Sequence, residues 1–233
     1  MRLRLTLLIC GLYVAAGCTG YNIRVTTYLS HELGFPAPRS DIRVGVVTRS
    51  EPAEPLLEAE VKRKIEWLLR DRGYAVGPVE DCDYMLTAFF AIDAGTTATR
   101  SYPVYHPGRR TTRHLRTCRG EWITEITRLP GRTTYRSRSY TYFTRHLGMT
   151  LYHRQRWLAA GEEDIAEAIA WRSDATSRGD SSDLRRVVDY LLVAAFGFFG
   201  EDTGKQVPVS LATSDERVRS LREGVRAKPA GGG

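Results

Sequence analysis

The chain has 233 residues and a formal net charge of +7, with 42% hydrophobic and 26% charged residues. These fractions are typical of globular proteins and exclude a chain of strongly biased composition. The positive charge is concentrated in residues 100–156, where thirteen arginines are accompanied by only two acidic residues, Glu121 and Glu125. That segment has a net charge of +11, so the rest of the chain carries −4.

The first residues have the pattern of an export signal. Arg2 and Arg4 supply positive charge, and residues 5–14 form an apolar run that is too short to span a bilayer. Three small residues, 15–17, then precede Cys18. A cysteine directly after such residues favours lipoprotein processing, because the lipid is transferred to its thiol.

We therefore predict a lipoprotein signal peptide over residues 1–17, acylation of Cys18, palmitate included, and a lipidated tether over residues 18–40. Ordinary cleavage without lipidation is the alternative, and Ala15 departs from the leucine that is usual at its position. Thr19, and not an aspartate, follows the cysteine. By similarity to lipoproteins that are sorted to the outer membrane, this residue favours that location. The expected location is the periplasmic side of that membrane in a Gram-negative envelope.

The first half of the domain contains the clearest elements. A short strand is expected over residues 21–28, and a β-branched run between turn formers predicts another over residues 42–48. Residues 54–73 should form a helix, since apolar side chains recur at helical spacing and Gly73 can end it. Residues 84–92 are apolar on both faces, which predicts a central strand of a covered sheet.

The basic middle of the chain has a weaker pattern. Residues 100–118, rich in Pro, Gly, Thr and Arg, are predicted to be a loop. Residues 121–127 alternate as a half-exposed strand does, and residues 133–143 suit a solvated hairpin. We expect residues 147–157 to return to the core.

The second half should hold one more strand and a core helix. Residues 162–170 are ambiguous, because their Ala and Glu content favours a helix whereas residues 169–177 fit a strand beside residues 147–157. Asp183 and the serines before it favour a helix start. Residues 184–195 are then predicted to form an apolar helix, too short for a membrane span.

These elements predict an α+β fold. We expect a two-layer sandwich, with a mainly antiparallel sheet of about four to five strands and two helices packed on one face. Residues 41–209 should form a single domain with an Arg/Tyr-rich hairpin insertion around residues 96–145. Residues 210–233 are predicted to be a polar, disordered tail.

Two cysteines remain once Cys10 has left with the leader and Cys18 has taken lipid. Cys82 and Cys118 are an even pair in an oxidising compartment, which favours a disulfide. Each of them opens a predicted strand, however, and antiparallel pairing would separate the two openings. Both alternatives stay open.

Short motifs in both halves of the domain have a family likeness. They are Leu56-Leu57-Glu58-x-Glu60, Arg72-Gly73-Tyr74, Cys82-Asp83-Tyr84, Ala170-Trp171-Arg172, Ala175-Thr176-Ser177, Ser181-Ser182-Asp183-Leu184 and Phe199-Gly200-Glu201-Asp202-Thr203-Gly204-Lys205. Over residues 21–207 the chain resembles bacterial lipoproteins of the domain of unknown function 4136 type. The resemblance implies an envelope-facing α+β domain and no established activity.

The basic segment is the best candidate for a binding site. Arginine forks pair with phosphate and carboxylate groups, and interleaved tyrosines offer stacking surface. Expected partners are lipopolysaccharide, phospholipid headgroups, peptidoglycan or an acidic periplasmic protein, whereas export argues against nucleic acid. A solvated face without a ligand is the alternative. The anion-binding candidates are Arg109, Arg110, Arg113, Arg116, Arg136 and Arg138.

Other chemistry finds little support in the sequence. His114 and Cys118 have the spacing of half a metal site, but no second pair completes it, so we expect no metal and no cofactor. Common hydrolase motifs are missing. Asp174, Asp180 and Asp183 could act as acids or bases, while Asp183 is better explained as a first-turn charge that complements the helix dipole.

The predicted function is that of a non-catalytic binding or scaffolding lipoprotein. A cofactor of a periplasmic enzyme or of a secretion or assembly machine is the first alternative, with a sheet edge or the hairpin as its interface. An envelope hydrolase is the second.

Overall fold

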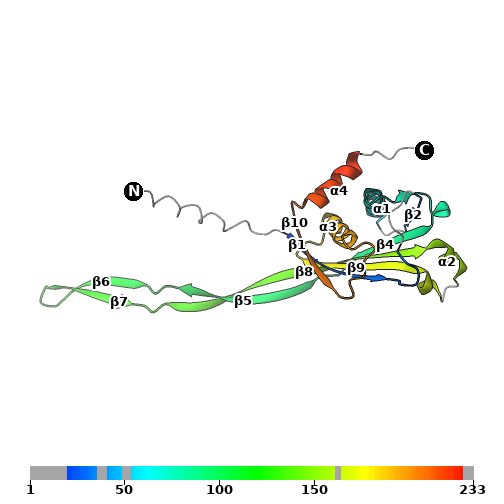
Figure 1. Ribbon diagram of the computed structural model, residues 1–233. Coiled ribbons are helices and arrows are strands. Elements are labelled where there is room, and N and C mark those ends of the chain that lie inside the picture. The colour runs from blue at the N-terminus through cyan, green and yellow to red at the C-terminus, as the bar shows by residue number, and fades with distance from the viewer. Residues whose placement is uncertain (1–19, 36–40, 49–53, 161–163, 228–233) are drawn as a thin grey trace, which may run out of the picture. The chain divides into compact units, whose positions relative to one another are not determined.

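The computed structural model describes residues 20–35, 41–48, 54–160 and 164–227. They belong to two compact units, one within Met1–Ala94 and Phe143–Gly233 and the other Gly95–Tyr142. We call these the α/β unit and the ribbon unit (Figure 1). The predicted signal peptide and the lipidation of Cys18 lie outside the described residues.

A mixed sheet is the main element of the α/β unit. Its strands have the order β10-β1-β9-β8-β4-β2-β3; β2 is parallel to β3 and β4, and the other neighbours are antiparallel. The strands are β1 (Gly20–Leu29), β2 (Arg43–Val47), β3 (Ala75–Val76), β4 (Tyr84–Ile92), β8 (Arg132–His153), β9 (Ile169–Gly179) and β10 (Val207–Ala212). Residues 132–142 of β8 belong to the ribbon unit.

Helices α1 (Pro55–Asp71) and α3 (Leu184–Phe196) cover one face of this sheet, and α4 (Glu216–Ala227) lies on the same side, packed against α1 and α3 (Figure 1). A short helix, α2 (Arg154–Ala159), follows β8 directly. The α1 helix starts at a proline, which is tolerated there because the first helical N–H groups have no partner within the helix. The Asp183 side chain accepts a hydrogen bond from the Arg185 backbone N–H at 3.0 Å and so caps α3.

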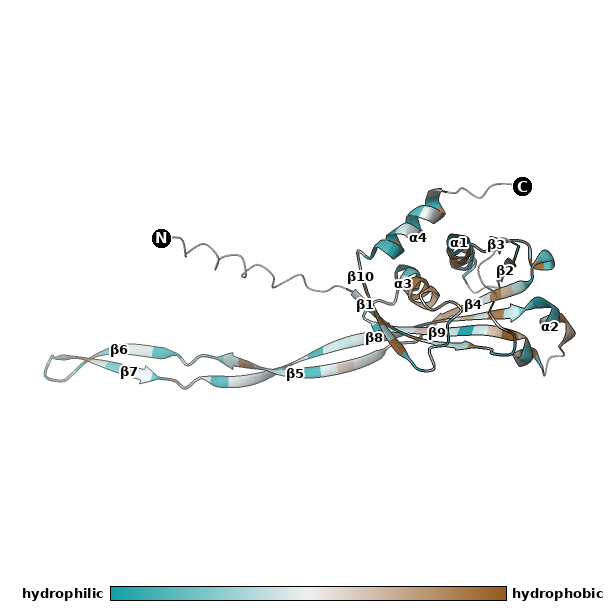
Figure 2. Ribbon diagram, viewed as in Figure 1, coloured by the Kyte–Doolittle hydropathy of each residue, from teal (hydrophilic) through white to brown (hydrophobic). Residues whose placement is uncertain are grey.

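The core lies between the sheet and these helices. Alternate residues of the central strands face it, as Leu86 of β4, Leu147 of β8 and Trp171 of β9 do. The α3 helix is the most apolar of these three helices, as its brown ribbon in Figure 2 shows. The opposite face of the sheet carries mostly polar side chains on β9, including Arg172 and Asp174.

The predicted fold class is wrong. Instead of a sandwich of four to five strands and two helices, the described residues form a mixed α/β fold with ten strands and four helices. The seven strands named above and β5 (Thr96–His106), which pairs with β8, make one large mixed sheet of eight strands, and β6 (Arg110–Arg116) and β7 (Trp122–Arg128) form a second sheet. Two causes account for most of the error. Residues 100–118 form strands without an apolar face, and β10, an edge strand with Val207, Val209 and Leu211, lies where the domain was expected to end.

The expected disorder of residues 210–233 is also wrong where the structure describes them. The β10 strand pairs with β1, and α4 buries Val218 and Leu221 against the core. By contrast, the predicted helix at residues 54–73, the strand at residues 84–92 and the core helix at residues 184–195 are confirmed by α1, β4 and α3. Residues 169–177 form the strand alternative, preceded by a short 3₁₀ turn (Ile165–Ala168).

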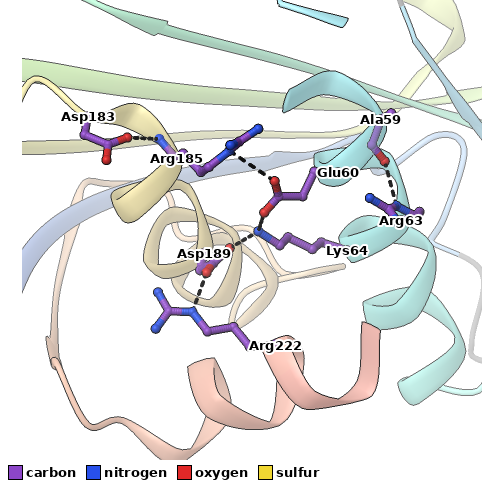
Figure 3. Close-up of polar contacts among 8 residues, drawn as sticks. All are labelled: Ala59, Glu60, Arg63, Lys64, Asp183, Arg185, Asp189 and Arg222. Carbon is purple, nitrogen blue, oxygen red and sulfur yellow. Dashed lines mark hydrogen bonds and ion pairs between the residues drawn. The ribbon is translucent and has the colours of Figure 1, made fainter. Parts of the chain in front are cut away.

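A buried charge network joins helices α1, α3 and α4 (Figure 3). The Lys64 ammonium of α1 lies 2.5 Å from an Asp189 carboxylate oxygen of α3 and 2.5 Å from Glu60. The other Asp189 oxygen accepts a hydrogen bond from Arg222 Nε of α4 at 2.6 Å, and Arg185 contacts Glu60 at 3.2 Å. Lys64 and Asp189 are almost inaccessible to solvent, so each depends on the other for its charge to be tolerated.

The docking of α4 gives a first prediction. Leu221→Ala should lower the free energy of unfolding by about 2–5 kcal/mol, because the leucine is fully buried. Leu56→Ala, at a leucine that is 78% exposed, is the matched control and should change it by less than about 0.5 kcal/mol. Urea denaturation followed by circular dichroism measures both. Equal stability of the two variants would mean that α4 does not contribute to the fold.

The charge network gives a second prediction. Asp189→Ala should destabilise the fold by up to about 3–5 kcal/mol, because it removes one of the two carboxylates that balance the buried Lys64 ammonium and leaves Arg222 without its ion pair. The double variant Lys64→Met/Asp189→Leu should recover most of that loss, since no buried charge remains. Arg70→Ala, which removes an exposed ion pair with Glu66, should cost at most about 1 kcal/mol. Failure of the double variant to recover stability would contradict this account.

Candidate anion-binding site

The ribbon unit consists of two antiparallel two-stranded ladders. In the β5–β8 ladder, β5 (Thr96–His106) pairs with residues 132–142 of β8. In the β6–β7 ladder, β6 (Arg110–Arg116) pairs with β7 (Trp122–Arg128). Every residue of β6 and β7 is exposed, so these strands have no apolar core of their own.

One face of the β5–β8 ladder is a row of paired hydroxyl groups. Residues directly opposite each other share a face, and successive residues alternate between the two faces. The hydroxyl oxygens lie 3.0–3.1 Å apart in three successive pairs, Thr97 with Thr141, Thr99 with Ser139 and Ser101 with Ser137. We call this the hydroxyl face.

The other face of the same ladder carries all of its arginines. These are Arg100, Arg132, Arg136 and Arg138, and each is exposed. Residues 96–106 and 132–142 contain no acidic residue, so the charge is not compensated within the ladder. We call this the arginine face.

Aromatic rings extend the arginine face along β8. The Arg138 guanidinium carbon lies 5.2 Å from the centre of the Tyr140 ring, within the range of a cation–π contact. Tyr140 stacks in turn on Tyr142, with ring centres 6.5 Å apart. These contacts hold one guanidinium against a flat surface and leave its N–H donors available to a ligand.

Two pairs of arginines stand directly opposite each other across the ladders. Arg100 pairs in register with Arg138, and Arg110 pairs with Arg128. Like charges directly opposite each other destabilise a sheet. A phosphate or carboxylate between two such guanidinium groups would remove the repulsion and accept several hydrogen bonds. The arrangement is therefore suited to an anion.

The six predicted arginines do not form one cluster. Arg136 and Arg138 lie on the arginine face, whereas Arg110 and Arg116 share one face of the β6–β7 ladder. Arg113 lies on the opposite face of that ladder, across from Glu125 in the register. Arg109, the sixth predicted arginine, lies in the connection between the two ladders. Its backbone carbonyl accepts a hydrogen bond from the Leu129 N–H at 2.8 Å.

Sequence reasoning missed Arg100, Arg128 and Arg132. For Arg100 and Arg132, the signal that could have found them is the alternation of Arg and Tyr with Ser and Thr through most of residues 132–142, together with a short matching alternation in residues 99–102. This signal does not extend to Arg128. Both strands must be recognised before the pairing can be seen, and the loop prediction concealed one of them.

The histidines of the ribbon unit contact hydroxyl groups. His106 Nε2 lies 2.8 Å from Thr134 Oγ1, and His114 Nδ1 lies 3.0 Å from Thr124 Oγ1. No group of three or more His, Cys, Asp or Glu side chains could hold a metal ion in the described part of the chain.

The two cysteines are not joined. Cys118 is exposed in the turn between β6 and β7, while Cys82 is buried at the start of β4 and donates a hydrogen bond to the Val79 carbonyl at 3.0 Å. Burial raises the pKa of the Cys82 thiol above its ordinary value. Both thiols are therefore free in the structure, and a Cys82–Cys118 disulfide stays an untested prediction.

Asp174 lines an open hollow of about 470 Å³ on the sheet face opposite the helices. Gly148 and Phe89 contribute to its lining, and Arg172 Nε donates a hydrogen bond to Asp174 at 3.2 Å. Asp174 is the only carboxylate among the described residues that line this hollow. Two positioned carboxylates, which many hydrolases use, do not meet there.

In the segments that the structure describes, no helix combines the length and apolar character needed to cross a bilayer.

Comparison with known proteins gives little. No protein-family model matches the sequence, and no curated protein matches it at a significant level. Among solved structures, a PDZ domain protein from Parabacteroides distasonis is similar over 83% of this chain, with 14% identity and a TM-score of 0.40. This chain covers 40% of that protein. A likeness this weak says nothing of function, and the resemblance to domain of unknown function 4136 lipoproteins stays a prediction.

The cysteine environments give a third prediction. In the native protein, N-ethylmaleimide should modify Cys118 rapidly, because this thiol is exposed. Cys82 should be modified only after unfolding, since it is buried and its raised pKa lowers the thiolate fraction near neutral pH. Peptide mapping by mass spectrometry distinguishes the two sites. Resistance of both thiols until a reductant is added would instead show a disulfide.

Proposed function

We propose that this chain is a lipid-anchored outer-membrane lipoprotein of the domain of unknown function 4136 type, with a non-catalytic binding domain in the periplasm. The ribbon unit binds an anionic component of the envelope through its arginine face. The phosphate groups of lipopolysaccharide and the carboxylates of peptidoglycan have the chemistry that this face recognises. The anchor is the acylated Cys18 that the leader sequence predicts.

The observation that carries the proposal is the separation of charge between the two faces of one ladder. Four arginines lie on one face and none on the other, and Arg100 and Arg138 repel each other across the strands. The ribbon unit as a whole contains ten arginines, no lysine and two acidic residues, a net charge of +8. Arginine is the cation best suited to bidentate contact with phosphate or carboxylate, so this composition favours anion binding over general solubility.

The free strand edges of the ribbon support a second candidate. Among the described residues, β5 pairs only with β8 and β6 only with β7, so both ladders have unpaired backbone groups on their outer edges. A strand of another protein could add to such an edge. This would suit a cofactor of a periplasmic enzyme or of a secretion or assembly machine. Binding of that kind depends on backbone hydrogen bonds and should survive moderate salt.

The test is co-sedimentation of the mature chain with purified peptidoglycan, and separately with vesicles that contain lipopolysaccharide. Cys18→Ser is included so that no acyl chain contributes to binding. Pelleting should weaken steeply between low and physiological salt, because exposed charges are screened over about 8–10 Å there. Arg136→Ser/Arg138→Ser should reduce the affinity about tenfold, since two exposed ion pairs are lost.

The matched control uses the same strand. Thr133→Glu/Tyr135→Glu changes the net charge by the same −2, at two exposed residues on the opposite face and outside the three hydroxyl pairs. It should bind much more tightly than the arginine double variant. Equal losses in the two variants would mean that only overall charge matters, and salt-independent pelleting would contradict the proposal.

A further inference from the structure

The end of the ribbon that holds the 117–121 turn carries a cluster of exposed apolar side chains. Trp122 is 69% exposed, Ile123 50%, Ile126 46% and Leu115 45%. Leu115 lies directly opposite Ile123, and Arg116 lies opposite Trp122, in the last two pairs of the β6–β7 ladder before the turn. Soluble domains seldom leave adjacent large apolar residues in water unless something covers them.

These side chains project from both faces of the β6–β7 ladder. Leu115 and Ile123 point to one face, while Trp122 and Ile126 point to the other. A protein partner that packs against a ribbon covers one face of it. A ladder that is apolar on both faces at the same end is better matched to a medium that surrounds it.

The charges around the cluster indicate which medium that is. Residues 110–128 contain five arginines and two acidic residues, a net charge of +3. Arginine can lay its aliphatic stem along apolar groups while its guanidinium reaches a phosphate. Tryptophan prefers the boundary between hydrocarbon and water, where its ring is buried and its N–H stays near polar groups.

We propose that the tip of the β6–β7 ladder inserts into the headgroup layer of an anionic phospholipid bilayer. Trp122, Ile123 and Leu115 enter the boundary with the acyl chains, and Arg116 contacts lipid phosphates. The inference rests on the proposed function, because it names one anionic envelope surface, but it depends on other residues than the arginine face.

The depth of insertion is limited by the backbone. Both outer edges of a two-stranded ladder have N–H and C=O groups without partners, and these cannot enter hydrocarbon without a large energetic cost. Each strand also has only seven residues, fewer than a membrane-spanning strand requires. Arg119 and Glu121, in the turn itself, are charged and must stay at the level of the headgroups. The tip therefore penetrates the interface and does not span the bilayer.

The experiment measures tryptophan fluorescence of the mature chain carrying Cys18→Ser. Vesicles are an equimolar mixture of phosphatidylethanolamine and phosphatidylglycerol, with acyl chains brominated near the headgroup. Bromine should quench the part of the emission that comes from Trp122. The emission that remains should equal that of the Trp122→Phe variant, which the brominated lipid should not quench. Trp157→Phe removes a tryptophan that is exposed on α2 and should retain the quenching. Vesicles of phosphatidylcholine alone should bind weakly, since they offer no net charge.

A second pair of variants tests the apolar contribution. Leu115→Ser/Ile123→Ser should lower the partition coefficient into the anionic vesicles at least about tenfold. Leu158→Ser, at an exposed leucine of α2, should leave it unchanged. Neither of these variants should change the binding of peptidoglycan. The Arg136→Ser/Arg138→Ser variant, by contrast, should weaken it.

Three results would overturn the inference. One is unquenched Trp122 in protein that pellets with the vesicles. Another is unchanged partitioning of Leu115→Ser/Ile123→Ser. The last is a Trp122 spectrum that shifts with protein concentration in the absence of lipid, since a second copy would then cover the tip. In each case the salt-dependent binding of peptidoglycan or lipopolysaccharide would stand or fall independently.

Discussion

The ribbon unit depends on the pairing of side chains across two strands that have no packed core beneath them. An isolated two-stranded ladder is only marginally stable in water, because neither face buries enough apolar surface. Each favourable cross-strand pair contributes about 0.2–1 kcal/mol, so the hydroxyl pairs of Thr97, Thr99 and Ser101 matter for holding the register. The same register brings Arg100 against Arg138, which opposes folding. The two faces thus have different roles: one maintains the ladder, and the other is more favourable when a ligand supplies negative charge.

The α/β unit obtains its stability in the ordinary way, from apolar residues between a sheet and helices, with one exception. Lys64 and Asp189 are buried among those residues, and their charges are matched by Glu60 and Arg222. A buried network of this kind adds less stability than apolar residues of the same size would. It does require that α1, α3 and α4 meet in one arrangement, because any other packing would leave a charge without its partner. The ion pair of Arg222 with Asp189 therefore helps, together with the buried Val218 and Leu221, to fix where α4 packs.

The sequence allowed the elements with strong apolar periodicity to be predicted. The α1 helix shows five apolar residues at helical spacing, and β4 is apolar on both faces, so both were located to within a few residues. In α4, by contrast, Val218 and Leu221 stand among charged residues, and the helix is amphipathic only when its packing partner is known. The β5 strand was missed for a different reason. Its residues are mostly Thr, Ser, Tyr and Arg, with a regular alternation only over residues 99–102, and methods that look for apolar alternation find nothing there.

The candidate site, like the fold, could be predicted only in part. Its chemistry, guanidinium groups interleaved with tyrosines, could be predicted from composition, but its geometry could not, because the face of each arginine depends on register. Once the register is known, charge and apolar surface lie in different parts of the ribbon. The β5–β8 ladder offers charge with no large aliphatic side chain on its arginine face, and the β6–β7 ladder adds four large apolar residues. Electrostatic attraction acts over about a Debye length and is weakened by salt, whereas apolar burial acts only at contact and is not. A ribbon with both should therefore approach an anionic surface through its charge and be retained there by its tip.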